Sequence, residues 1–136
     1  QLQSVTSIPA TSPMRTTADI VKVVNHFHKS KFDMVMTITE SHRNPWFNMV
    51  CQDGCGEIRL ANQPKVAIHR RQDAPKVFDL TTVCNIFNPN FIINANSHFE
   101  GKIGGVVIPK IRAIDIDDEL DFLVAEQIHR YLNNEQ

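Results

Sequence analysis

A chain of 136 residues is long enough for one domain with a sizeable hydrophobic core and too short to expect two. It carries 14 Lys and Arg against 15 Asp and Glu, and the resulting charge of −1 excludes a basic field that would hold nucleic acid or an anionic membrane. Its apolar runs fall far short of the roughly 20 residues that span a bilayer. Three cysteines without a secretory segment indicate reduced thiols, so we expect a cytoplasmic protein.

The first part of the chain alternates a strand, a helix and a strand. Residues 4–8 are short, β-branched and apolar, as in a strand. Thr16 or Thr17 caps a helix in which apolar residues recur at helical spacing as far as Lys29. Residues 34–39 then form an apolar run typical of a buried strand. This order predicts a βαβ unit of a parallel sheet. Because the chain starts without Met within the first strand, we interpret its start as processing, a cloning boundary or a missing N-terminal part.

The middle of the chain, at about residues 41–79, is rich in turn residues and predicts a hairpin-rich excursion from the main sheet. The last part returns to long regular elements and ends in a helix with an apolar stripe. The expected pieces are short strands at 48–51, 57–60 and 66–69, a strand at 80–87, a short helix at 89–93, a strand at 102–108 and a helix capped by Asp117 or Asp118.

The stretch RAIDIDDELDF, which starts at residue 112, is unusually acidic. Asp115 and Asp117 are two residues apart, so in an extended segment both side chains leave from one face. Two such carboxylates suit Mg²⁺, which keeps several waters and shares its other sites with substrate phosphates. The alternative is helix capping, in which Asp118, Glu119 and Asp121 also complement the helix dipole. Capping does not explain Asp115, which lies before the helix.

Two further segments have the chemistry of anion binding. Arg70 and Arg71 are adjacent in the turn-rich excursion, where arginine forks can hold a carboxylate or phosphate and where a solvated surface turn is the alternative. The segment PATSPMR, residues 9–15, joins the end of a strand to the start of a helix. Free backbone N–H groups and hydroxyls at such a junction can meet an anion.

Taken in order, PATSPMRTTADI, DMVMTITESHRNPWF, RRQDAPKVFDLTTV and PKIRAIDIDDELDFLVAEQI resemble the C-terminal part of the CMP-sialic acid synthetases, or acylneuraminate cytidylyltransferases. The resemblance covers nearly the whole chain. It implies an α/β fold, here a partial Rossmann-like three-layer sheet in a single domain of residues 1–136, with a β-rich dimerisation arm at about 41–79. It also implies a transferase that moves CMP from CTP to an acidic nine-carbon sugar with Mg²⁺.

Residue by residue, the resemblance places the catalytic and metal-binding roles on Asp115 and Asp117. It places substrate binding on the loop that shapes the sugar site and on the basic segment near the acidic sugar. The substrate-binding residues that it implies are Thr11, Ser12, Arg15, Arg70, Arg71 and Gln72.

The chain also departs from the family pattern. Many relatives have Gln-Pro where this chain has Pro9 and Ala10, and Asn-Gly where it has Thr81 and Thr82, so the sugar is left open. The family's Gly- and basic-rich nucleotide loop has no counterpart in these residues. We therefore expect negligible catalysis by this chain alone and a homodimer or a partner chain that completes the site. The alternative is a truncated, non-catalytic assembly module that dimerises through the arm.

Overall fold

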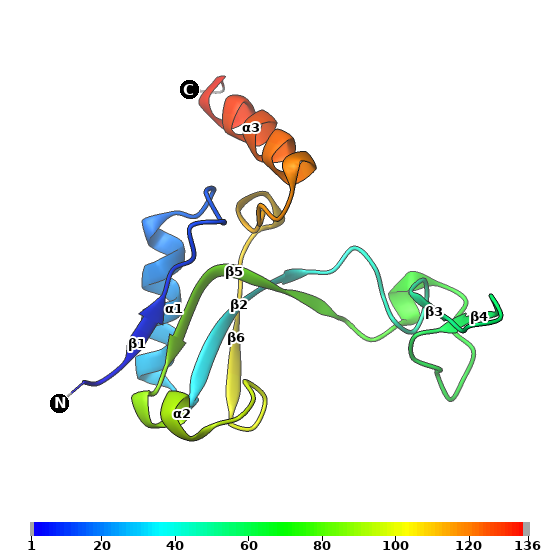
Figure 1. Cartoon of the computed structure of the whole chain (residues 1–136), viewed down its shortest axis with the longest axis horizontal. Helices are drawn as coiled ribbons and strands as arrows, with labels where there is room; N and C mark the ends of the chain where they lie inside the picture. The colour runs from blue at the N-terminus through cyan, green and yellow to red at the C-terminus, as the bar shows by residue number, and fades with distance from the viewer. Residues whose placement is uncertain (1, 135–136) are drawn as a thin grey trace. The chain divides into compact units, whose positions relative to one another are not determined.

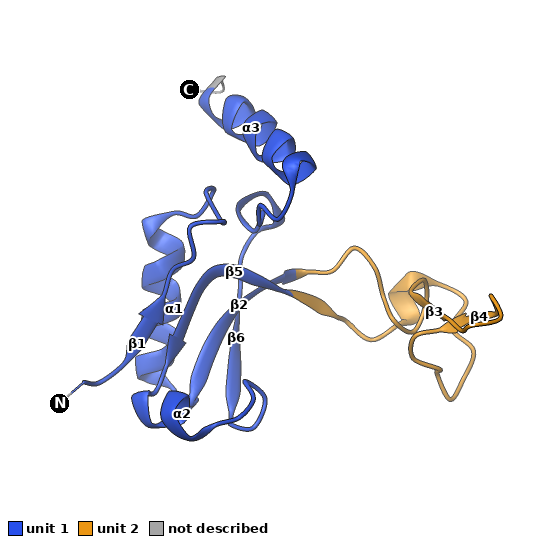
Figure 2. Cartoon of the chain, viewed as in Figure 1, with its two compact units in different colours: residues 1–39, 80–136 blue, residues 40–79 orange. Residues whose placement is uncertain are grey.

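The computed structural model describes residues 2–134 and divides the chain into two compact units, which Figure 2 distinguishes by colour. Unit 1 comprises residues 1–39 and 80–136, and unit 2 comprises residues 40–79. Unit 2 thus occupies nearly the same range as the predicted excursion.

Unit 1 is built around a four-stranded sheet with the order β1-β5-β2-β6 (Figure 1). β1 pairs with β5 in antiparallel register, and β2 pairs with β6 in parallel register. β5 and β2 run in opposite directions, because Thr37 contacts Thr81 while the carbonyl of Asp33 accepts from the N–H of Asn88. The bounds are β1 Val5–Ser7, β2 Met34–Glu40, β5 Phe78–Phe87 and β6 Ile103–Val107.

This topology corrects the expectation of a parallel sheet. β1 and β2, which precede and follow helix α1 (Thr17–Lys29) in the chain, do run parallel, but β5 is inserted between them, so the sheet is mixed. The physical reason is that the chain leaves β2 for unit 2 and returns directly into β5, and a returning strand pairs antiparallel. Local periodicity carries no information about this return.

Helix α1 (Thr17–Lys29) begins where its capping residues predict. Thr16 accepts from the N–H of Asp19, and Asp19 accepts from the N–H of Thr16 at 3.0 Å, which forms a capping box. The helix buries Val23 and Phe27 in the core against side chains from the sheet. The buried core residues are Val23, Phe27, Val35, Val83, Cys84, Ile86, Val106 and Ile108.

Gly104 on the edge strand β6 leaves room for the ring of Phe32. A Cβ on Gly104 would lie 2.5 Å from Cδ2 of Phe32, closer than such atoms pack. Phe32 can pack against this position only because no side chain is present there, so Gly104 is explained by ring packing.

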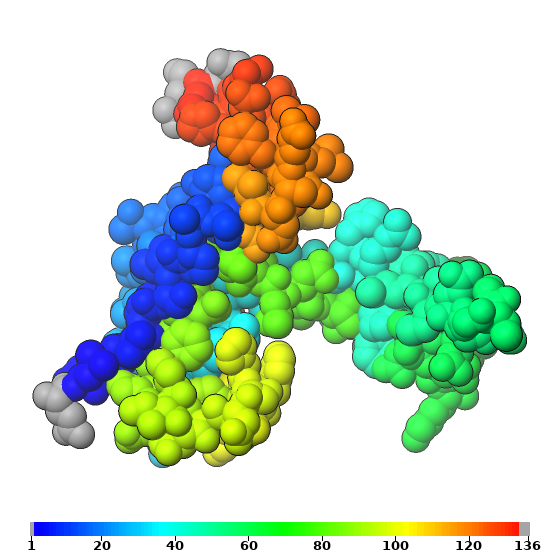
Figure 3. All heavy atoms as spheres, in the orientation of Figure 1, coloured from blue at the N-terminus to red at the C-terminus, as the bar shows by residue number. Residues whose placement is uncertain are grey.

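The start of helix α3 (Glu119–Asn134) shows which of the two candidate aspartates, Asp117 or Asp118, caps it. The carboxylate of Asp118 accepts the N–H of Asp121 at 2.9 Å, so Asp118, and not Asp117, occupies the cap position. The predicted apolar stripe of α3 is largely exposed: Leu120 retains 67% and Leu123 50% of its accessible surface. In Figure 3, no other segment covers the side of α3 that faces the viewer.

The remaining elements are short. In unit 2, β3 (Val50–Gln52) and β4 (Ile58–Leu60) form an antiparallel hairpin, whose turn contains Gly56 with a φ of 88°. The predicted strand at 66–69 is wrong, because these residues have no ladder partner. The others are α2 Pro89–Asn94 and the 3₁₀ turns η1 Arg71–Asp73 and η2 Lys110–Arg112.

Candidate functional site

The loop at residues 9–15, between β1 and α1, is held in shape by Arg15. The Arg15 guanidinium donates to the carbonyls of Ser12 at 2.8 Å and Val83 at 3.0 Å, and also to the carbonyl of Pro9. Three backbone acceptors thus share one cation, which places the Arg15 charge inside the loop. Among the predicted substrate-binding residues, Arg15 is therefore the one that organises the loop.

Ser12 and Thr11 have different environments in this loop. Ser12 is fully buried, and its hydroxyl lies 2.6 Å from the hydroxyl of Thr82 on β5. Thr11 is exposed, and its carbonyl accepts the N–H of Ile116 at 2.9 Å. The loop is therefore tied to the sheet on one side and to the acidic segment on the other.

The acidic segment lies between η2 and α3, where the hydrogen bond from Ile116 to Thr11 brings Asp115 and Asp117 next to the loop. Asp117 is exposed. Asp115 is half-buried, and its Oδ1 is inaccessible to solvent and has no hydrogen-bond partner in the part of the chain that the structure describes. A buried carboxylate oxygen without a partner is costly, so it marks a position where a cation or a donor from a ligand fits.

The donor set is compatible with Mg²⁺ that is shared with a substrate. Within residues 2–134, no group of three or more His, Cys, Asp or Glu side chains is arranged to hold a metal ion. Two carboxylates alone make an incomplete site, and Mg²⁺ commonly binds through one or two carboxylates and completes its shell with water and phosphate oxygens. The buried free oxygen of Asp115 and the adjacent Asp117 fit that mode.

An ion pair that the sequence analysis did not identify anchors the acidic segment to helix α1. Nε of Arg112 lies 2.9 Å from Oδ2 of Asp19, and Nη2 of Arg112 lies 2.9 Å from Oδ1. Asp19 retains only 3% of its accessible surface. The capping-box spacing from Thr16 to Asp19 could have indicated the buried carboxylate, but its arginine partner lies 93 residues away in the chain.

The ion pair with Arg112 affects the pKa of the Asp19 carboxyl. Burial raises the pKa of Asp19, but hydrogen bonds from Arg112 and Thr16 outweigh it and hold this pKa below its ordinary value of 3.8. A carboxyl with a lowered pKa stabilises the fold above its unfolded-state pKa, and that contribution is lost as the pH falls through the folded-state pKa. The pair is therefore intact at neutral pH.

Thr81 and Thr82, at the position where many relatives differ, are both hydrogen-bonded inside unit 1. Thr81 is buried and donates to the hydroxyl of Thr37 at 2.7 Å, and Thr82 contacts Ser12 as described above. Nearby, burial raises the pKa of the Cys84 thiol, and the charge of Arg15 lowers it less. Cys84 is fully buried in the core cluster of unit 1.

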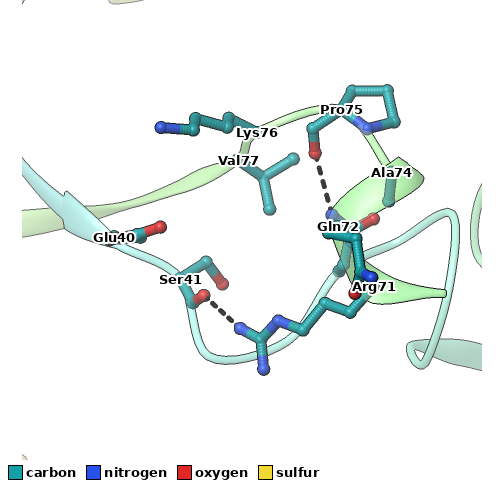
Figure 4. Close-up of a pocket in the computed structure, with 9 residues that line it drawn as sticks. Glu40, Ser41, Arg71, Gln72, Ala74, Pro75, Lys76 and Val77 are labelled. Atoms are coloured by element: carbon teal, nitrogen blue, oxygen red, sulfur yellow. Dashed lines mark hydrogen bonds between the residues drawn. The ribbon is translucent and has the colours of Figure 1, made fainter.

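Unit 2 contains a cavity of about 370 Å³ in which two of the predicted substrate-binding residues lie (Figure 4). Nη2 of Arg71 donates to the carbonyl of Ser41 at 2.9 Å, and Gln72 follows on the same 3₁₀ turn. Arg70 is exposed and precedes that turn. Lys76 adds a second cation to the lining, which the sequence analysis did not identify. The lining residues are Glu40, Ser41, Asn44, Arg71, Gln72, Ala74, Pro75, Lys76 and Val77.

A buried asparagine holds this part of unit 2 together. Asn44 donates from Nδ2 to the carbonyl of Pro75 at 2.9 Å and accepts the N–H of Trp46 at 2.9 Å. Its own N–H donates to the side chain of Asn48 at 2.7 Å. The bond to Pro75 joins two residues that line the cavity.

None of the described helices is long and apolar enough to cross a membrane.

No protein-family model matches the chain. The chain is similar to two curated proteins from Campylobacter. It is 30% identical over 127 residues to post-translational flagellin modification protein B of Campylobacter coli, a match that covers 93% of this chain and 52% of that protein. It is 32% identical over 95 residues to CMP-N,N'-diacetyllegionaminic acid synthase of Campylobacter jejuni, covering 68% of this chain and 38% of that protein.

The fold is similar to the crystal structure of 4-diphosphocytidyl-2C-methyl-D-erythritol synthase from Anaerococcus prevotii. The TM-score is 0.62 at 14% sequence identity, and the match covers 94% of this chain and 59% of that one. This likeness confirms the predicted α/β, Rossmann-like fold class. The chain spans about half the length, or less, of the curated relatives it matches. The sequence similarity relates this chain to parts of these two curated proteins, and the structural likeness shows that it has the α/β fold of the synthase from Anaerococcus prevotii.

Proposed function

We propose that this chain supplies the metal-binding and sugar-binding groups for CMP transfer from CTP to an acidic, sialic-acid-like sugar. The observation that carries the proposal is the buried Oδ1 of Asp115, which has no hydrogen-bond partner in the described part of the chain. It lies next to a loop that Arg15 and Thr82 hold in place. A relative named as a CMP-sugar synthase supports the substrate class. In this reaction the anomeric hydroxyl loses its proton, its oxygen bonds to the α-phosphorus of CTP, and the bond from that phosphorus to pyrophosphate breaks.

The acidic segment would act at the phosphates. Asp115 and Asp117 would hold Mg²⁺, which when bound neutralises negative charge on the α-phosphoryl and pyrophosphate oxygens. Bound Mg²⁺ would give the buried carboxylate oxygen of Asp115 a partner. The carbonyl of Thr11 accepts the N–H of Ile116 and would hold the backbone between the two aspartates in place.

The cavity of unit 2 would hold the sugar carboxylate. Arg71 uses one Nη for the Ser41 carbonyl and has further N–H groups for an anion, and Lys76 lines the same cavity. Gln72 offers an amide for sugar hydroxyls. The carboxylate of Glu40 in the lining would accept hydrogen bonds from hydroxyls and would disfavour a second anionic group.

The test is isothermal titration of the purified chain with CTP in the presence and absence of Mg²⁺. We expect Mg²⁺-dependent binding that weakens at least about tenfold, or about 1.4 kcal/mol, in Asp115→Ala. Asp79→Ala is the matched control, because it removes an exposed carboxylate from β5, and it should bind as the unaltered chain does. Absence of Mg²⁺-dependent binding in the unaltered chain would contradict the proposal.

Exposed apolar side chains favour a second candidate, in which the chain is an assembly module. Leu120 and Leu123 on α3 are at least half exposed, and in unit 2 Val50 and Ile58 expose 54% and 62% of their surfaces on one face of the hairpin. Apolar surface of this kind marks sites of association.

For the assembly candidate we expect a dimer by size-exclusion chromatography with light scattering. A dimer that Ile58→Glu dissociates and Leu123→Glu preserves would assign the interface to the arm, which was the expectation from the sequence. The reverse result would assign it to α3. A monomer at every accessible concentration would exclude the assembly role.

A further inference from the structure

The segment that carries the two aspartates has few attachments to the rest of unit 1. After β6 the chain makes the short turn η2, and the next backbone hydrogen bond to a distant segment is the one from Ile116 to Thr11. Between them, Ala113 packs at the border of the core. The direction in which Asp115 leaves the backbone therefore depends on two attachments, the hydrogen bond from Ile116 to Thr11 and the contacts that hold η2.

Arg112 holds η2 through a two-pronged contact. Both nitrogens that contact Asp19 lie at 2.9 Å, one on each carboxylate oxygen, so the guanidinium plane is oriented as well as attracted. Asp19 is itself immobilised, because the same carboxylate accepts the N–H and the hydroxyl of Thr16 at the start of α1. The result is a rigid connection from the N-terminus of a packed helix to a residue three positions before Asp115.

We propose that Asp19 and Arg112 are positioning residues that set the orientation of Asp115 for its ligand. The metal-binding part rests on the function proposed above. Asp19 is buried, and Arg112 uses Nε and Nη2 for the Asp19 carboxylate, so we assign the pair a positioning role and no substrate contact. Their role is to fix the acidic segment against α1, as outer groups around a metal site fix the groups that touch the metal.

The predicted signature combines local exchange with ligand affinity. In Asp19→Asn and in Arg112→Lys, one prong of the contact or its geometry is lost while the residue size is nearly kept. We expect amide hydrogen exchange at Ile116, whose N–H donates to Thr11, to accelerate more than exchange at Val35 in the core. The Mg²⁺-dependent affinity for CTP should fall about tenfold to a hundredfold.

A second ion pair in the chain provides the matched control. Glu126→Gln makes the same carboxyl-to-amide change in the exposed Glu126–Arg130 pair of α3, which also has an N–O distance of 2.9 Å. It should leave both measurements unchanged. A folded Arg112→Lys variant with the affinity and the Ile116 exchange of the unaltered chain would overturn the positioning role.

The two proposals can fail separately. If the unaltered chain does not bind CTP with Mg²⁺, the proposed function fails, and the exchange measurement still decides whether the ion pair orders the acidic segment. If the chain binds but both variants bind equally well, the proposed function stands and the positioning role fails. Equal acceleration of exchange at Ile116 and Val35 would show general destabilisation and would also contradict the positioning role.

Discussion

Replacement of Arg15 with Ala is expected to lower the free energy of unfolding by about 3–5 kcal/mol, because it removes the partner of three backbone carbonyls at once. The acceptors are in the loop at residues 9–15 and on the central strand β5. Of these, Val83 lies in a fully buried position, where water cannot replace the lost donor. Urea unfolding followed by circular dichroism measures the change.

Arg59→Ala is the control for charge and chain length. Arg59 is exposed on β4, where a surface substitution changes stability by about 0.5 kcal/mol or less. Arg15→Lys should be intermediate, since an ammonium group cannot reach three carbonyls with the geometry of a guanidinium. A loss below about 1 kcal/mol in Arg15→Ala would show that the loop carbonyls are satisfied in another way.

Replacement of Ile86 with Ala should destabilise unit 1 by about 2–5 kcal/mol. Ile86 is completely buried on β5, and it belongs to the cluster that joins α1 to the sheet. The truncation removes apolar contacts and leaves a cavity that close-packed neighbours fill only in part.

Ile93→Ala makes the same chemical change at the end of α2, where the side chain is 79% exposed. It should change the unfolding free energy by about 0.5 kcal/mol or less. Thermal unfolding of both variants under identical conditions tests the difference. Equal destabilisation would mean that Ile93 is covered in solution by a segment or a partner, and would support the assembly candidate.

The candidate site was predictable from the sequence in its composition and only partly in its geometry. The spacing of the two aspartates, Asp115 and Asp117, is a local feature, and so is the acidic start of the helix. Of the two residues expected to cap that helix, Asp117 and Asp118, the structure shows Asp118 in the cap position. The resemblance placed Arg15 in the loop that shapes the sugar site, and its guanidinium donates to backbone carbonyls of that loop and of β5. The contact between Arg112 and Asp19 was missed, since the two residues are far apart in the chain and each is unremarkable alone.

The sequence by itself determined the elements whose signals are local: the capping box at Thr16, the apolar face of α1, the buried run of β2 and the acidic start of α3. These depend on side chains a few residues apart, so periodicity and capping chemistry are sufficient. Only the tertiary structure decided that β5 enters between β1 and β2 and that residues 66–69 do not pair. It also decided that one oxygen of Asp115 is buried without a hydrogen-bond partner among residues 2–134. Strand pairing and burial depend on which distant segments meet, and no local pattern encodes that choice.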